Sequence, residues 1–332
     1  MYKTNQFDFF IHSSRIWVRH SYNALNLKAE LTNARGQIRK FFYDALGRIT
    51  GYLAEENEVC YTYDENGNIL TVSDRNGTIS RTYDALNRVT CYTDTFGNVI
   101  QYRYDAVGNL EYLIYPDGSE VYYSYDVNNN LVSVTDWAGR TTTYTYDENN
   151  RAIGVTKPDG SVTTTVYDNK QRIISTVEKL PDDTIISGFE YEYDEIGRIS
   201  SEKVLAKNEK MCYTYDEQSR VVKRTVVSLS GSTETEETFS YDAAGNITED
   251  NSFDYTYDTN NRLIEFKGNP VSYDLDGNML SNGSLSCAYD SGNRLISAGD
   301  HIYTYNAENV RIRNLCTDAE TTYVYNTNCK LK

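Results

Sequence analysis

A short phrase that recurs along almost the whole chain constrains the fold more than any other feature of the sequence. It reads Tyr-Asp-x-x-Gly/Asn-Arg/Asn-Ile/Leu, and residues 43–49 and 63–69 are two of its copies. We call each copy a repeat mark. Thirteen Tyr-Asp pairs occur, at Tyr43, Tyr63, Tyr83, Tyr104, Tyr125, Tyr146, Tyr167, Tyr193, Tyr215, Tyr241, Tyr257, Tyr273 and Tyr289, with weaker Tyr-Asn versions at Tyr22, Tyr305 and Tyr325. Such a repeat predicts one array of similar units instead of several independent domains.

Each unit contains two turn signals. The first is the Asp-x-x-Gly/Asn of the mark, and the second lies about halfway to the next mark, as in residues 94–97. An aspartate at the first turn position bonds its own backbone, and glycine or asparagine at the fourth accepts a left-handed conformation. The segments between the turns, such as residues 141–146, are β-branched and aromatic, which favours strands. Each unit is therefore predicted to be one β-hairpin.

The repeat assigns structural roles to the tyrosine, aspartate and glycine of each mark, because a turn already accounts for these residues. The clearest copies contribute Tyr43, Asp44, Gly47, Tyr63, Asp64, Gly67, Tyr104, Asp105, Gly108, Tyr193, Asp194, Gly197, Tyr241, Asp242 and Gly245.

Tyrosines often fall two residues apart, as in Tyr61/Tyr63 and Tyr144/Tyr146. Residues two apart in a strand point to the same face of a sheet. Neighbouring units are therefore expected to place tyrosine over tyrosine, and cross-strand aromatic pairs contribute roughly 0.2–1 kcal/mol each.

The spacing between marks divides the chain into regions. Residues 1–20 carry no mark and are expected to be a non-repeat leader, with disorder as one expectation. Residues 21–332 are predicted to form one β-array, with 20–21-residue hairpins to about residue 167, longer hairpins over 168–240, 16-residue hairpins over 241–305 and a last unit over 306–332. The extra residues at 179–183 and 230–234 indicate longer loops. The 16-residue step shortens each strand by about two residues, so the sheet is expected to narrow.

Composition excludes several classes of protein. The 31 tyrosines at regular spacing argue against disorder. The net charge of −16, without any basic run, argues against nucleic-acid binding. Six scattered cysteines without a Cys-x-x-Cys motif do not indicate a disulfide framework. No apolar stretch approaches the ~18 residues of a membrane span, and the first residues do not form a secretory signal.

The repeated mark, with its halfway turn, resembles the RHS/YD-repeat family over roughly residues 20–332. The family includes bacterial polymorphic-toxin RHS proteins, wall-associated proteins, the cocoon of insecticidal toxin complexes and animal teneurins. The resemblance implies an antiparallel sheet of consecutive hairpins that spirals into a hollow shell around a C-terminal toxin segment. It also implies secretion or display at the cell surface as part of a longer protein.

In full members of that family, a core that closes the shell follows the repeats. This sequence ends before a closing core or toxin region. We therefore expect an open, partial shell that tapers toward its C-terminus, and a fragment or split gene product is one interpretation. The partners that the resemblance implies are the rest of a larger RHS protein and its C-terminal toxin domain.

No residue pattern indicates catalysis. The three histidines, His12, His20 and His301, are scattered, so neither a triad nor a zinc site is indicated. Residues 274–278 supply oxygen ligands at the first three odd positions of a calcium loop, but glycine stands at position 4 and Leu285 at position 12. We therefore predict no catalytic residue, no cofactor and no metal.

Two functions remain open at this point. The first is a non-catalytic structural module of an RHS-type toxin protein that encapsulates cargo. The second is a cell-surface adhesion or carbohydrate-binding module, because sheet faces rich in tyrosine can stack against sugar rings. The competing explanation for the tyrosines is that they pack the sheet itself, since an isolated hairpin cannot bury a face.

Overall fold

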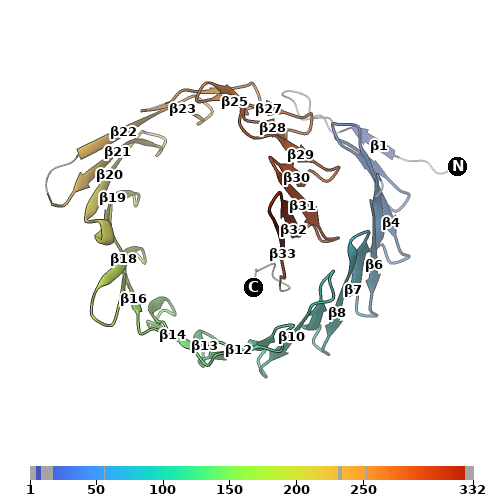
Figure 1. Cartoon of the computed structure of the whole chain (residues 1–332), viewed down its shortest axis with the longest axis horizontal. Coiled ribbons are helices and arrows are strands. Elements are labelled where there is room, and N and C mark those ends of the chain that lie inside the picture. Colours follow the sequence, from blue (N-terminus) through green and yellow to red (C-terminus); the bar gives the residue numbers. More distant parts are fainter. Residues whose placement is uncertain (1–4, 9–17, 56, 231–233, 252, 326–332) are drawn as a thin grey trace. The chain divides into compact units, whose positions relative to one another are not determined.

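The computed structural model of the protein describes residues 5–8, 18–55, 57–230, 234–251 and 253–325. Within them, the regular structure is β-strand, apart from one 3-10 turn, η1 (Leu205–Lys207). Strands that follow one another in the sequence pair antiparallel, as in β6–β7 and β16–β17 (Figure 1). The predicted all-β fold of consecutive hairpins is confirmed.

The chain divides into two compact units, of which unit 1 comprises residues 1–102 and 255–332 and unit 2 comprises residues 103–254. The first segment of unit 1 contains β1 (Asn5–Asp8), β2 (Arg19–Tyr22), β3 (Lys28–Thr32), β4 (Ile38–Tyr43), β5 (Ile49–Ala54), β6 (Asn57–Tyr63), β7 (Ile69–Asp74), β8 (Gly77–Tyr83), β9 (Val89–Thr93) and most of β10 (Val99–Tyr104). Its second segment contains β24 (Tyr255–Tyr257), β25 (Leu263–Phe266), β26 (Asn269–Pro270), β27 (Ser272–Tyr273), β28 (Met279–Ser281), β29 (Cys287–Tyr289), β30 (Leu295–Ala298), β31 (His301–Tyr305), β32 (Arg311–Cys316) and β33 (Ala319–Thr322).

Unit 2 contains β11 (Leu110–Ile114), β12 (Glu120–Tyr125), β13 (Leu131–Thr135), β14 (Thr141–Tyr146), β15 (Ala152–Thr156), β16 (Val162–Tyr167), β17 (Ile173–Lys179), β18 (Ile185–Tyr193), β19 (Ile199–Val204), β20 (Glu209–Tyr215), β21 (Val221–Ser228), β22 (Glu234–Tyr241) and β23 (Ile247–Asp250). In the leader, residues 5–8 form β1, which pairs with β2.

The turn chemistry of the marks follows the pattern that the sequence predicts. In the second complete mark, the Asp64 N–H donates to the Asn68 carbonyl at 3.0 Å, and the Gly67 N–H donates to the Asp64 carbonyl at 3.2 Å. The ladder shifts register at Tyr63, which lies opposite Ile69. This is a three-residue hairpin loop with a left-handed residue at its end, and Gly67 has φ of +89°. Where asparagine replaces glycine, as at Asn87, φ is +61°.

The longer spacing in unit 2 lengthens strands more than loops. β17 has 7 residues and β18 has 9. The turn between them keeps the usual bonds, from the Leu180 N–H to the Thr184 carbonyl and from the Asp183 N–H to the Leu180 carbonyl. The prediction of a longer loop at 179–183 is therefore wrong, because paired strands take up the added residues. The second predicted loop, at 230–234, falls largely outside the described residues.

The strands shorten where the marks come closer together. From β24 to β30 each strand has 2 to 4 residues. The 16-residue step predicts this narrowing. The turn of each mark keeps its length, whereas the second turn is one residue shorter than at residues 94–98, as in the bond from the Asn282 N–H to the Leu285 carbonyl. β31 and β32 lengthen again, to 5 and 6 residues.

The tightest hydrophobic packing lies in unit 1. Val59, Val72 and Ile79 are completely buried. Val59 and Val72 form a cluster with Tyr52, Ala54 and Ala307. Three partly buried side chains pack against this cluster: Phe41, Tyr61 and Ile69. Ala307 comes from the turn between β31 and β32, so the second segment of unit 1 contributes to the core of the first.

Candidate functional site

The aspartate of each mark holds its own turn through both carboxylate oxygens. In Asp44, Oδ1 accepts the N–H groups of Leu46 and Arg48, each at 2.9 Å, and Oδ2 accepts Nε of Arg48 at 2.6 Å. In Asp64, Oδ2 accepts the side-chain amide of Asn68 at 2.8 Å instead. Both arginine and asparagine occur at this position of the repeat because both donate to the same oxygen.

In eleven marks the tyrosine hydroxyl bonds the backbone of the unit before. The Tyr43 hydroxyl donates to the Lys28 carbonyl at 2.8 Å, and the Tyr63 hydroxyl donates to the Ile49 carbonyl at 2.7 Å. The acceptor is the seventh residue of the preceding mark. The same bond is made by Tyr83, Tyr125, Tyr146, Tyr167, Tyr193, Tyr215, Tyr241, Tyr273 and Tyr305.

Where the preceding mark carries an arginine, the ring of the next mark's tyrosine packs under that arginine in seven of these units. The guanidinium of Arg48 lies 4.7 Å from the Tyr63 ring centre, and that of Arg172 lies 4.1 Å from the Tyr193 ring centre. The same contact pairs Arg151 with Tyr167, Arg198 with Tyr215, Arg220 with Tyr241, Arg262 with Tyr273 and Arg294 with Tyr305. One arginine thus binds the aspartate of its own mark and covers the tyrosine of the next.

This arrangement corrects the expected ladder of tyrosine over tyrosine. A cross-strand tyrosine pair is present at Tyr112 and Tyr122, with ring centres 5.0 Å apart, but neither residue belongs to a mark. Tyr61 and Tyr63 do share a face, since Thr62 between them is exposed. Where the mark carries arginine, its guanidinium lies against the face of the next mark's tyrosine ring, which is a favourable cation–π contact.

The structure places the residues singled out by the sequence at equivalent positions of separate hairpins. Asp105, Asp194 and Asp242 each accept the N–H groups two and four residues later. Tyr104 ends β10. Positive φ angles occur at Gly47 (79°), Gly67 (89°), Gly108 (107°), Gly197 (94°) and Gly245 (90°). These residues form a scaffold and not a common centre.

Replacing Tyr63 with phenylalanine is expected to destabilise the protein by about 1 kcal/mol, because the Ile49 carbonyl loses its donor while the ring remains. Tyr122→Phe is the matched control, since Tyr122 is 37% exposed. Urea denaturation measures both. Equal stability of the two variants would show that the hydrogen bond from the Tyr63 hydroxyl to the preceding unit does not stabilise the fold.

The turn aspartates make stability depend on pH. Hydrogen bonds from the Asn68 side chain and backbone hold the pKa of Asp64 below its usual value, and those from Arg151 do the same for the pKa of Asp147. An aspartate whose pKa is lower in the folded state than in the unfolded state stabilises the fold when the pH is above its unfolded-state pKa. This stabilisation is lost as the pH falls through the folded-state pKa. We therefore expect a melting temperature that is level from neutral pH to about pH 5 and falls steeply below about pH 4. A level profile down to pH 3 would contradict this.

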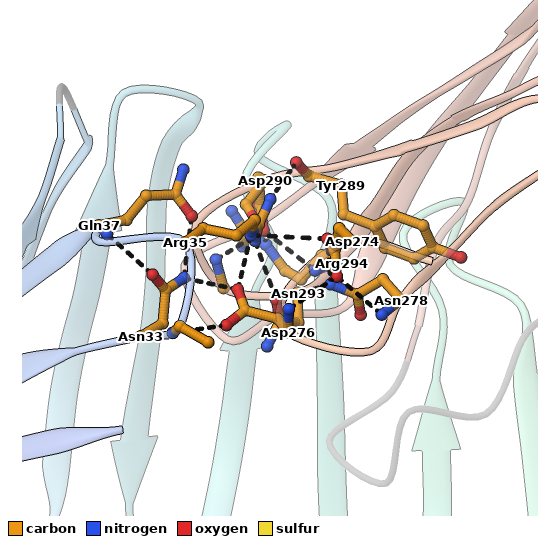
Figure 2. A network of polar contacts seen from close by, with 12 residues as sticks. Asn33, Arg35, Gln37, Asp274, Asp276, Asn278, Tyr289, Asp290, Asn293 and Arg294 are labelled. Carbon is orange, nitrogen blue, oxygen red and sulfur yellow. Dashed lines mark hydrogen bonds and ion pairs between the residues drawn. The ribbon is translucent and has the colours of Figure 1, made fainter. Parts of the chain in front are cut away.

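A network of polar contacts joins the two segments of unit 1 (Figure 2). Arg35, in the turn between β3 and β4, donates from Nε to Asp276 Oδ2 at 2.5 Å and lies 3.5 Å from Asp274 Oδ2. Its Nη1 and Nη2 donate to the carbonyls of Tyr289 and Asp290. The Asp276 side chain is 3% exposed, so the ion pair is buried.

The same network extends to the neighbours of Arg35. Asn33 donates from Nδ2 to Asp276 at 2.8 Å, and the backbone N–H of Ala34 donates to Asp276 Oδ1 at 2.7 Å. Nη2 of Arg35 also donates to Asn293 Oδ1 at 2.9 Å. A single carboxylate, that of Asp276, therefore accepts from three successive residues of the first segment.

A second group of contacts lies around Ala307. Arg81 donates to both carboxylate oxygens of Glu308, at 2.6 and 2.7 Å. Asn76 donates from Nδ2 to the Tyr305 carbonyl at 2.9 Å. Between them Ala307 is 2% exposed, in the hydrophobic cluster with Tyr52. We call these contacts and those of Arg35 the seam.

The described ladders of unit 1 run within its first segment or within its second, so the seam consists of side-chain and turn contacts. The sequence predictions did not include it. Asp274 and Asp276 belong to the phrase that resembles part of a calcium loop, but their oxygens accept N–H donors from Asn33, Arg35 and Asn278.

Within the described ranges, no group of three or more His, Cys, Asp or Glu side chains is placed to hold a metal ion. Burial raises the pKa of Tyr61 and of Tyr123 to about 12, so both phenols stay protonated at neutral pH. His301 Nδ1 bonds Asn314 Oδ1 at 3.0 Å, far along the chain from His20. In the same described part, helices long and apolar enough to cross a membrane are absent.

Comparison with known proteins identifies a family whose model matches the repeats of this chain. The model of the teneurin YD-shell family matches residues 10–179 and 162–330. The fold is similar to that in the crystal structure of TcdB2-TccC3-Cdc42, with a TM-score of 0.74 and 14% identity over 95% of this chain. For TcdB2-TccC3 without the hypervariable C-terminal region, the TM-score is 0.76 and the identity 15% over 95% of this chain. The chain spans about a fifth of those chains, 21% and 20% respectively. The curated proteins contain no match.

Proposed function

Because the chain belongs to the teneurin YD-shell family, we propose that it is a non-catalytic section of a shell that walls off a polypeptide cargo. Its partners are then the rest of a larger RHS-type protein and a toxin segment that this protein carries. The work of such a section is mechanical: it keeps the cargo from refolding and from contacting other proteins.

The observation that carries this proposal is the seam. A wall must keep its edges together under the pressure of an enclosed chain, and strand pairing alone leaves edges exposed. In unit 1 a buried ion pair at Asp276 and a buried Ala307 hold together segments that are more than 200 residues apart in the sequence. The turn aspartates and eleven of the mark tyrosines form bonds that hold the hairpins, which supports a scaffold role.

A protease-protection assay tests the proposal. In the longer RHS-type protein, a small, protease-sensitive reporter replaces the toxin segment, and its rate of digestion is compared with that of the free reporter. We expect digestion at least about 10-fold slower in the fusion. The matched control is the same fusion carrying Arg35→Ala, in which the protection is expected to fall. Digestion of the intact fusion at the rate of the free reporter would contradict encapsulation.

We also propose export to the cell surface or the medium as part of the longer protein, on the basis of the family resemblance. Fractionation of cells that express the full-length protein tests this. Carbohydrate binding and attachment to a cell wall stay predictions. The mark tyrosines support them poorly, because their hydroxyls bond the backbone and their rings lie under arginines.

A further inference from the structure

A pocket of about 290 Å³ lies in unit 1 beside the seam. Strands β4 and β5 contribute Arg39 and Tyr52 to it, and the turn after β29 contributes Asp290 and Gly292. The other lining residues are Ala54, Glu55, Asn57, Arg75, Ser291 and Arg294. The volume is near the lower end of the range for ligand sites, about 300–1,000 Å³, which suits a small molecule.

Among the described lining residues of this pocket, three arginines accompany two carboxylates. Arg294 is bound to Asp290 Oδ2 at 2.6 Å, and Glu55 accepts from the Gln37 side chain at 2.6 Å. For Arg39 and Arg75, the described residues place no carboxylate within ion-pair distance. Arg39 and Arg75 therefore line the pocket without an ion-pair partner among the described residues. Such a pair favours an anion.

Two atoms of the lining are buried and lack a hydrogen-bond partner. They are Nε of Arg39, which is a donor, and Oδ1 of Asn57, which is an acceptor. The Arg39 guanidinium is held over the Tyr52 ring, 4.8 Å from its centre, and so cannot readily swing away. Buried polar groups are nearly always satisfied, so an unsatisfied pair of opposite kinds indicates a group that supplies both an acceptor and a donor.

Gly292 gives independent support for the shape of this pocket. The left-handed position of its turn is Asn293, with φ of +60°, so backbone conformation does not require glycine at 292. A Cβ at 292 would lie 3.1 Å from Nη2 of Arg39 and 3.2 Å from Oδ1 of Asp290. Glycine here therefore leaves room for the Arg39 guanidinium.

We propose that this pocket binds a small carboxylic acid that carries a hydroxyl or ammonium group near its carboxylate. Arg39 and Arg75 hold the carboxylate, and Asn57 Oδ1 accepts a hydrogen bond from the hydroxyl or ammonium group. The carboxylates of Asp290 and Glu55 in the lining disfavour a doubly charged anion such as phosphate. No step of the proposed shell function depends on this site.

Isothermal titration calorimetry of the full chain tests the site with four probes in two matched pairs. D-glucuronate is compared with D-glucose, and L-alanine with L-alaninamide, so that each control lacks only the carboxylate and the two arms separate a hydroxy acid from an amino acid. We expect saturable binding of one of the two acids in the range of about 0.1–1 mM, and binding of its partner without the carboxylate at least about 10-fold weaker.

Two variants and one further anion complete the test. Arg75→Gln changes an exposed side chain, so it should weaken the binding about 10-fold while the melting temperature stays the same. Arg39→Gln should abolish the binding. Three results would each overturn the proposal: neither acid binds up to about 10 mM, Arg75→Gln binds the acid as tightly as the natural chain, or inorganic phosphate binds more tightly than either acid.

Discussion

Arg35→Ala is expected to destabilise the protein by about 3–5 kcal/mol, the largest loss we expect from changing one polar side chain. The guanidinium donates to Asp276, to Asn293 and to the carbonyls of Tyr289 and Asp290. Alanine leaves the Asp276 carboxylate, 3% exposed, with only uncharged donors. A buried charge without its partner costs more than the pair contributes, so the loss exceeds that of a surface ion pair.

Arg140→Ala is the matched control. Arg140 forms the same kind of pair, with Asp136, but its side chain is 60% exposed. The expected loss is below about 1 kcal/mol. Denaturant unfolding of both variants, followed by circular dichroism, gives the comparison. If Arg35→Ala and Arg140→Ala lower the free energy of unfolding equally, the contacts of Arg35 are no stronger than a surface ion pair.

Ala307→Asp is expected to cost about 3–5 kcal/mol at neutral pH. Ala307 is 2% exposed in the cluster with Val59 and Val72, and the new carboxylate would have to enter that cluster charged or take up a proton. Burial raises the pKa of a carboxyl, so the loss from this substitution should shrink as pH falls toward 5.

Ala45→Asp is the control for this second change. Ala45 holds the same position in its mark as Ala307, two residues after the tyrosine, but it is exposed. We expect its effect to stay within about 0.5 kcal/mol. Thermal unfolding at pH 7 and pH 5 measures both variants. An Ala307→Asp protein as stable as Ala45→Asp would show that Ala307 is not packed against the first hairpins.

Local chemistry explains why the hairpins could be predicted from the sequence. An aspartate followed three residues later by Gly67 or Asn87 leaves few alternatives, because the left-handed angle there excludes most residues. Regular spacing then sets strand length, including the short strands from β24 to β30. The prediction of a longer loop at residues 179–183 was wrong because the spacing between marks gives only the total number of residues in a unit. It does not show how many belong to the strands and how many to the turn.

The seam could not be predicted because its residues carry no local signal. Arg35 stands in an ordinary turn phrase, and Asp276 resembles any other turn aspartate. Ala307 and Ala45 occupy the same place in the repeat, yet only the former is buried. Contacts between residues about 240 apart depend on how the hairpins stack, which a single sequence does not encode in any short window.

The arginine contacts could be predicted in part, unlike the seam. The mark itself contains the arginine, as at Arg48, and its bond to Asp44 follows from the turn. Its second contact, with the Tyr63 ring, requires the next unit to lie alongside. The fixed spacing of Arg and Tyr in the repeat indicates this contact, whereas the spacing of the tyrosine pairs does not.

The seam is tested most directly by hydrogen exchange at the backbone amide of Ala34. This N–H donates to Asp276 Oδ1, a side chain 242 residues away, so only the seam accounts for its protection. The Gly36 amide bonds the Asn33 carbonyl within the same turn and serves as the internal reference. Residue-resolved exchange should show a slow Ala34 amide that becomes at least about 10-fold faster in Asp276→Ala, while Gly36 changes little. An Ala34 amide that exchanges at the same rate in both proteins would contradict the seam.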